Sequence, residues 1–193
     1  MTVTGNVRRR WRTVDIVVAA TIAVAFGVVF WAWGILWGAV SPAFVAFPPA
    51  QGFMTSIWLV PGVLGAMIIR KPGAAIFCEV VAAAIEPLLG SQWGVLDIVS
   101  GLAQSVGPEL VFAAFAYRRW GLGVALGAGA AAGLGNAVND IVTSYATWPV
   151  GWMATYGGLI IVSAIVVAGG GGWWLTRALA RAGALTPFAS ARG

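Results

Sequence analysis

The sequence contains no histidine and only one cysteine, Cys78, in 193 residues. A chain without histidine has no histidine general base and lacks the commonest zinc ligand, and one cysteine cannot form an intrachain disulfide. Charged residues are scarce too, at 9% of the chain, against about 25% in soluble domains. These shortages exclude a disulfide framework, a zinc site and histidine-based acid–base catalysis. We therefore expect no catalytic residue, no metal site and no cofactor.

Hydrophobic residues make up 60% of the chain. They form six runs separated by short connections, at residues 14–37, 53–69, 74–89, 95–116, 121–142 and 154–176. A helix of about 17–25 apolar residues can cross a bilayer, and the second and third runs lie at or just below that lower limit. The sequence therefore predicts an all-α, polytopic membrane protein, with one six-helix transmembrane bundle over residues 14–176.

The positive charges are distributed asymmetrically. All eleven Lys and Arg residues precede the first run, separate the second from the third or the fourth from the fifth, or follow the sixth. The alternate connections, around residues 38–53, 90–94 and 143–153, carry none. Because Lys and Arg mark cytoplasmic loops, we expect a basic cytoplasmic N-terminus at residues 1–13 and a cytoplasmic tail at residues 177–193. Orientation and anionic lipid explain the pI near 10.4 better than nucleic acid does.

Glycine, alanine and proline suggest finer features. The connection 38–52, with three prolines, is interpreted as a lid or re-entrant segment, or else as an ordinary connector. The glycines at 169–172 interrupt the last run. Ala19 and Ala23 in the first run, and Gly129 and Gly133 in the fifth, repeat at the four-residue spacing of close helix contacts. We expect internal packing for the fifth helix, and internal packing or docking of a partner protein for the first.

Polar residues inside the runs are expected to carry the function, because a charge at the bilayer centre costs about 2.5–3.5 kcal/mol. Two helical turns separate Glu79 from Glu86, so they share a face of the third helix. The fourth helix carries Asp97, Ser100, Gln104 and Glu109, and the fifth carries Asn136, Asn139 and Asp140.

The predicted orientation sorts these groups by depth. It brings Glu86, Gln104, Asn136 and Asp140 together in the outer half, above a floor formed by Glu79 and Glu109. No Lys or Arg lies within a run, so the site should be anionic or its carboxylates partly protonated. A cation or a donor-rich ligand would suit it. Of the many tryptophans near the outer face, one or two, such as Trp33, could stack on a flat cationic ring.

One region carries a family resemblance. The stretch Ile69–Gly90, IRKPGAAIFCEVVAAAIEPLLG, resembles the signature region of YkoE-type S-components of energy-coupling-factor transporters. Gln104 and the run GPELVF at Gly107–Phe112, with Glu109 in the acidic position, extend the similarity. The resemblance implies a membrane subunit that binds thiamine or its hydroxymethylpyrimidine precursor from outside. It also implies a transmembrane coupling subunit and two cytoplasmic ATPases as partners, with Ala19 and Ala23 at the coupling contact.

Three alternatives are weighed against this interpretation. The chain has no G-x-x-x-x-G-K-[ST] motif, so ATP hydrolysis would belong to another chain and this chain is not expected to be an enzyme. A cation-coupled secondary transporter would use the buried acids for protons or Na⁺, but no internal repeat relates the first three runs to the last three. A purely structural subunit would have little use for so many buried acids.

Overall fold

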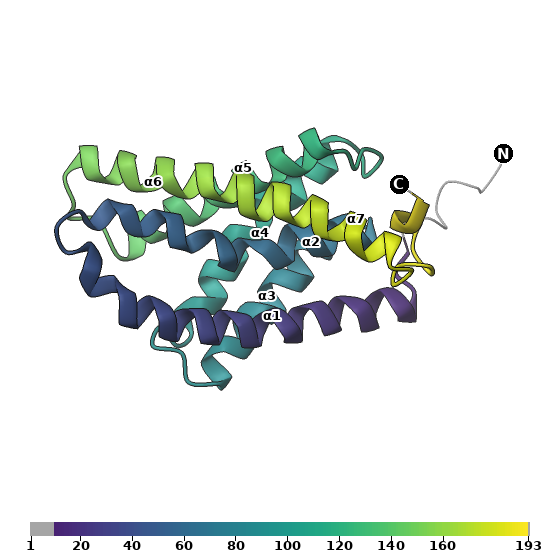
Figure 1. Cartoon of the computed structure of the whole chain (residues 1–193), viewed down its shortest axis with the longest axis horizontal. Helices are drawn as coiled ribbons and strands as arrows, with labels where there is room; N and C mark the ends of the chain where they lie inside the picture. The colour runs from purple at the N-terminus through teal and green to yellow at the C-terminus, as the bar shows by residue number, and fades with distance from the viewer. Residues whose placement is uncertain (1–9, 193) are drawn as a thin grey trace.

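The chain folds into six helical segments, arranged as an elongated bundle (Figure 1). The computed structural model describes residues 10–192, so most of the predicted basic N-terminus, Arg8 and Arg9 included, lies outside the described residues. Within that range every regular element is helical. The segments are α1 (Thr13–Val40), η2 (Pro48–Leu59) with α2 (Val60–Ile69), α3 (Ala74–Leu88), α4 (Leu96–Ala114), α5 (Leu122–Thr143), and α6 (Val150–Ala164) with η3 (Ile165–Gly171) and α7 (Gly172–Arg181).

The predicted all-α, six-helix architecture is confirmed, and four of the segments are long and apolar enough by themselves to cross a membrane. Those four are the segments that begin at Thr13, Pro48, Leu122 and Val150. The other two fall short for visible reasons. Helix α3 has only 15 residues, and the apolar sequence of α4 is interrupted by acids and a glutamine. Both carry residues of the site described below.

The second segment reaches a membrane-spanning length by changing its winding. Its first 12 residues, η2, form a 3₁₀ helix, which rises about 2.0 Å per residue instead of 1.5 Å. Together η2 and α2 extend over roughly 39 Å, so an apolar run that looked short can cross a core of about 30 Å. All ten residues of α2 are buried, and the helix contacts α3, α4 and α7. It is the central helix of the bundle.

The first connection is mostly helical, which is not what its prolines suggested. Helix α1 continues to Val40, η1 (Ser41–Phe44) follows directly, and η2 begins at Pro48 after a turn. Residues 38–52 therefore form the end of α1, the short helix η1, a turn and the start of η2, which is the arrangement of an ordinary connector.

The small residues of α1 pack inside the chain. Ala19 and Ala23 are completely buried, and Gly27 lies so close to α3 that a Cβ there would sit 2.6 Å from Cβ of Ile85. The prediction that Ala19 and Ala23 dock a partner protein is therefore wrong: α3 already occupies that face. The opposite face of α1 exposes Val17 and Val24, as expected for a surface in contact with lipid.

The last segment does not break at its glycines. The helix passes through Ile165–Gly171 with π-type hydrogen bonding and continues as α7. Gly169 is needed there for contact and not for flexibility, since a Cβ would lie 2.7 Å from the carbonyl oxygen of Ala125 on α5. Gly129 on α5 lies directly against Gly169, so the small residues of α5 pack inside the chain, as the spacing of Gly129 and Gly133 predicted.

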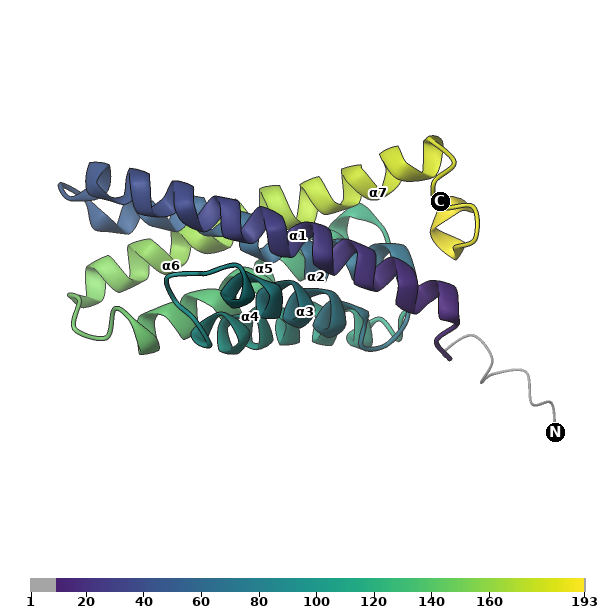
Figure 2. The ribbon, with the colours of Figure 1, turned by 90° about the horizontal axis from the view of Figure 1, so that it is seen from below.

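Both ends of the described chain lie at the same end of the bundle (Figures 1 and 2). Asp15, completely buried, pairs there with Arg12 at 2.8 Å and with Lys71 from the α2–α3 connection. The hydrogen bond with Asp15 raises the pKa of Arg12 above its usual range. After α7 the chain folds back over this end, where Leu185 and Phe188 are buried. The hydroxyl of Ser190 donates to the carbonyl of Ile68 at 2.9 Å.

The contact between α5 and η3 gives a test of the packing. We expect Gly129→Ala to destabilise the fold by about 1–3 kcal/mol, because its methyl group would collide with the backbone at Ala164 and Gly169. Gly123→Ala on the same helix meets nothing within 4 Å and should leave stability unchanged or slightly raised. Thermal unfolding of the two variants in detergent measures the difference. Equal midpoints would show that this contact is not tight.

Candidate functional site

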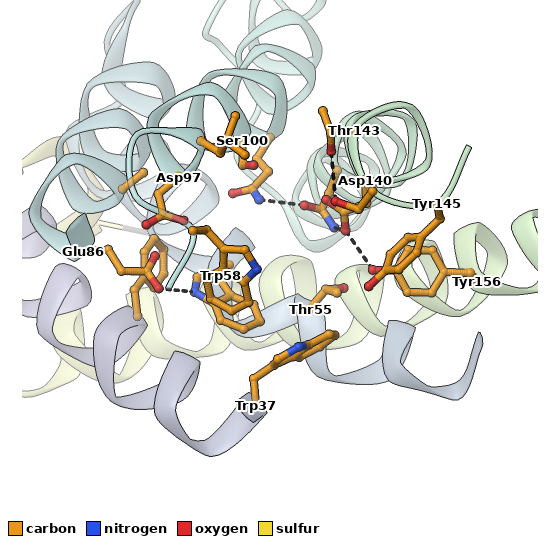
Figure 3. A pocket seen from close by; sticks show the side chains of 17 residues that line it. Trp37, Thr55, Trp58, Glu86, Asp97, Ser100, Asp140, Thr143, Tyr145 and Tyr156 are labelled. Carbon is orange, nitrogen blue, oxygen red and sulfur yellow. Dashed lines mark hydrogen bonds between the residues drawn. The ribbon is translucent and has the colours of Figure 1, made fainter. Parts of the chain in front are cut away.

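A cavity of about 120 Å³ opens between α1, η2, α3, α4, α5 and α6. It lies away from the end that holds Asp15 and the C-terminal segment, and its walls combine carboxylates, amides and aromatic rings (Figure 3). Four of the sequence-predicted site residues line it: Glu86, Gln104, Asn136 and Asp140. The structure thus brings together residues from three separate helices, as their predicted depths suggested.

One end of the cavity is a chain of hydrogen bonds. Asp140 accepts from the hydroxyl of Tyr156 at 2.8 Å and from the amides of Asn136 and Asn139 at 3.0 and 3.3 Å. An amide atom of Gln104 lies 2.7 Å from Oδ1 of Asn136. Asp140 therefore has three protein donors and little acceptor capacity left. This end is rigid, polar and already satisfied.

Glu79 lies below this chain and does not line the cavity itself. It is almost completely buried, and the backbone N–H of Gly62 donates to its Oε2 at 2.8 Å. One amide atom of Gln104 lies 2.9 Å from Oε1 of Glu79 and 3.1 Å from the carbonyl oxygen of Trp58. Glu79 therefore lies next to Gln104, below the cavity, and its role as the floor of a binding site stays a prediction.

The other end of the cavity holds two carboxylates with few partners. Glu86 is 3% exposed and accepts only a long hydrogen bond, 3.4 Å, from the indole of Trp58. Asp97 is 7% exposed, is hydrogen-bonded by Ser91, and its buried Oδ2 has no partner. The two groups are close enough to repel one another. Buried polar atoms are almost always hydrogen-bonded, so an orphaned carboxylate oxygen in a cavity wall points to a ligand.

Aromatic rings complete the walls. Trp37, Trp58 and Trp93 meet edge to face, with centroids 5.6–6.5 Å apart, beside the acidic end. Tyr145 and Tyr156 meet in the same way, 5.0 Å apart, at the polar end. Tyr145 lies in the connection after α5, and burial raises the pKa of its hydroxyl. The cavity offers flat apolar faces as well as acceptors, a combination that suits planar ligands.

Among residues 10–192, no Lys or Arg side chain lines the cavity. The described Lys71 and Arg12 are bound to Asp15 at the other end of the bundle. Glu86, Asp97 and Asp140 therefore face the cavity without a counter-ion from the protein, as the predicted anionic site requires. Within residues 10–192, no three His, Cys, Asp or Glu side chains come together as metal ligands would.

Two predicted site residues lie elsewhere. Glu109 lies on α4, and its nearly buried carboxylate reaches the start of α3. There it accepts hydrogen bonds from the backbone N–H groups of Gly73 (2.6 Å) and Ala75 (3.1 Å) and from the hydroxyl of Tyr117 (2.6 Å). Glu109 thus accepts hydrogen bonds from the free backbone N–H groups at the N-terminus of α3, and it does not form the floor of the cavity. Trp33 points its indole N–H at the carbonyl of Met54, 2.8 Å away, and ties α1 to η2. Both assignments to the binding site are corrected by these contacts.

The cavity also contains residues that the sequence did not single out, namely Thr55, Trp58, Thr143, Ser144 and Tyr145. Thr55 and Trp58 lie in an apolar run, and the 3₁₀ winding of η2 places both on the side that faces the cavity. Their three-residue spacing was the available signal. The other three follow Asp140 closely, at the end of α5, and proximity to an already suspected residue could have identified them.

Comparison with known proteins finds a family model, a relative and a solved structure that are similar to this chain. Residues 14–135 match the family model described as "ABC-type cobalt transport system, permease component". Over 150 residues the chain is 33% identical to the "Putative HMP/thiamine permease protein YkoE" of Bacillus subtilis (strain 168), covering 75% of this chain and 72% of that protein. A solved structure described as an S-component of an ECF transporter is similar with a TM-score of 0.89 at 30% identity, covering 95% of this chain and 92% of the other.

Two glutamates in similar surroundings give a test of these assignments. Glu109→Gln should destabilise the fold by about 1.5–3 kcal/mol, because it weakens charge-assisted hydrogen bonds from two backbone N–H groups and a tyrosine. Glu86→Gln should leave stability unchanged or raise it, since it removes repulsion with Asp97 and loses only one long hydrogen bond. Thermal unfolding compares the two. A larger loss in Glu86→Gln would mean that the roles are reversed.

Proposed function

The chain belongs to the YkoE-type family of S-components of energy-coupling-factor vitamin transporters, and we propose that it captures thiamine or hydroxymethylpyrimidine in the cavity between Glu86 and Asp140. It is a multi-pass membrane protein of a vitamin-uptake system. The observation that carries the ligand assignment is a cavity with three carboxylates, aromatic walls and, in the part of the chain that the structure describes, no lining Lys or Arg.

The chemistry of thiamine matches these walls. Thiamine joins a cationic thiazolium ring to an aminopyrimidine ring, and hydroxymethylpyrimidine is the pyrimidine part alone. The carboxylates attract the cation, and tryptophan faces favour it as well. Gln104 and Asn136 offer the paired donors and acceptors that an aminopyrimidine needs. Hydrophobic faces with a few converging polar groups are typical of small-molecule sites.

The transport step is assigned to other subunits. The chain has no phosphate-binding loop, so two cytoplasmic ATPases and a transmembrane coupling subunit are the proposed partners. The coupling subunit must use a surface other than the face of α1 that holds Ala19 and Ala23, because α3 covers that face. The exposed apolar face of α1 is available to lipid and to a partner helix alike.

Tryptophan fluorescence tests the ligand assignment directly. Trp37, Trp58 and Trp93 line the cavity, so a bound ring should quench the emission of the detergent-purified chain. We expect saturable quenching with thiamine or hydroxymethylpyrimidine at submicromolar concentration and none with riboflavin, a larger tricyclic vitamin.

A flat response to thiamine and hydroxymethylpyrimidine in a folded sample would contradict the proposed function. Uptake by the reconstituted chain alone, driven by an imposed ion gradient, would instead identify a cation-coupled secondary transporter. The native Cys78 is buried and should not react in the cysteine-labelling experiment described next.

We further propose that both termini face the cytoplasm and that the cavity opens to the outside. The positive charges support this orientation. A single reactive cysteine at Val45 should be labelled in intact cells by a membrane-impermeant maleimide, because Val45 lies in the connection without positive charge and is 82% exposed. A cysteine at Gly121, beside Arg118 and Arg119, should be labelled only after permeabilisation. Labelling at position 121 in intact cells, and at position 45 only after permeabilisation, would show that the chain has the opposite orientation.

A further inference from the structure

The two ends of the cavity differ in chemistry. Figure 3 shows Glu86, Asp97 and Trp58 at one end and Asp140, Tyr145 and Tyr156 at the other. At the polar end the carboxylate of Asp140 already has three protein donors. At the acidic end Oδ2 of Asp97 has none, and Glu86 has one long hydrogen bond. Unmet acceptor capacity and unbalanced charge are therefore concentrated at Glu86 and Asp97.

We infer that Glu86 and Asp97 form a cation subsite that binds the thiazolium ring of thiamine and is not needed for the pyrimidine ring. This inference rests on the proposed function and adds the direction in which the ligand lies. Two adjacent carboxylates without a counter-ion are costly in an apolar bundle, and a ligand cation between them relieves both the repulsion and the missing contact. The neighbouring faces of Trp37, Trp58 and Trp93 favour the same charge.

The shape of the interior supports this direction. An apolar cavity of about 150 Å³ accommodates a molecule the size of benzene, so the main cavity, at about 120 Å³, holds roughly one ring. A second cavity of about 190 Å³, lined by Ser91 and Gln92, shares Glu86 and Trp93 with the first. A two-ring ligand with one ring near Asn136 and Gln104 therefore extends past Glu86 toward the second cavity. The junction of the two cavities is the acidic end.

The consequence is a residue-level rule for selectivity. Hydroxymethylpyrimidine is neutral and has only the ring that the polar end holds, so it gains nothing from Glu86 and Asp97. Thiamine gains an ionic interaction with both. The two acids should therefore set the preference for thiamine over its precursor, while Asp140, through Asn136 and Gln104, should serve both ligands equally.

The experiment measures affinities of thiamine and hydroxymethylpyrimidine for the purified full chain and for Glu86→Gln, Asp97→Asn and Asp140→Asn. We expect Glu86→Gln and Asp97→Asn each to weaken thiamine about tenfold or more, and to change hydroxymethylpyrimidine less than about twofold. Asp140→Asn removes the same charge from the other end of the cavity and, unlike the other two variants, should weaken hydroxymethylpyrimidine as well as thiamine. Unchanged thiamine affinity in both acidic-end variants, or equal losses for the two ligands, would overturn the inference.

A measurement on the unmodified chain removes any dependence on how the variants fold. A thiamine analogue in which an uncharged thiophene replaces the thiazolium has nearly the same shape. We expect it to bind about tenfold or more weakly than thiamine, and to bind Glu86→Gln as well as it binds the unmodified chain. Equal binding of thiamine and the neutral analogue to the unmodified chain would overturn the cation subsite and leave the proposed function intact. Binding of none of these compounds would reject both.

Discussion

Carboxylates buried inside an apolar bundle are the constraint to which the rest of this structure is fitted. Each buried carboxylate must accept hydrogen bonds from protein donors, or else its oxygens are left without a partner until a ligand binds. Glu79 takes a backbone N–H of η2–α2 and an amide of Gln104, and Glu109 takes two N–H groups at the start of α3. Asp15 takes Arg12 and Lys71. These contacts join the helices to one another, so the acids far from the cavity hold the bundle together while those at its acidic end remain open.

The helices of the bundle also approach one another closely enough for their backbones to touch. In a membrane, lipid gives no hydrophobic drive to helix association, and packing must supply it. Gly129 and Gly169 bring α5 and η3 together, and Gly27 lets α1 lie against α3. Cavity walls built from six segments stay in position because their backbones touch at these points. The polar residues are thus presented on a scaffold with little freedom to move.

The sequence predicted the helices well because their signal is long-range and physical: an apolar run must be long enough to span, and the arginines mark one side. It also predicted that Glu86, Gln104, Asn136 and Asp140 lie together, since helical spacing and depth decide which groups can meet. It failed for Glu109, Trp33, Ala19 and Ala23, because a buried acid, an interfacial tryptophan or a row of small residues looks the same whether its partner is a ligand, another protein or the chain itself. Only neighbours in space separate those cases.

The 3₁₀ winding of η2 has a consequence for how the site can change in evolution. In such a helix the side chains at every third position lie above one another, so Gly52, Thr55 and Trp58 form one straight row. Gly52 lies against α6, where a Cβ would meet the carbonyl of Tyr156 at 2.8 Å, and Thr55 and Trp58 line the cavity. Substitutions at positions 55 and 58 therefore change the shape of the cavity wall one side chain at a time. Insertion of a single residue before them would instead turn the whole row of side chains away from the ligand.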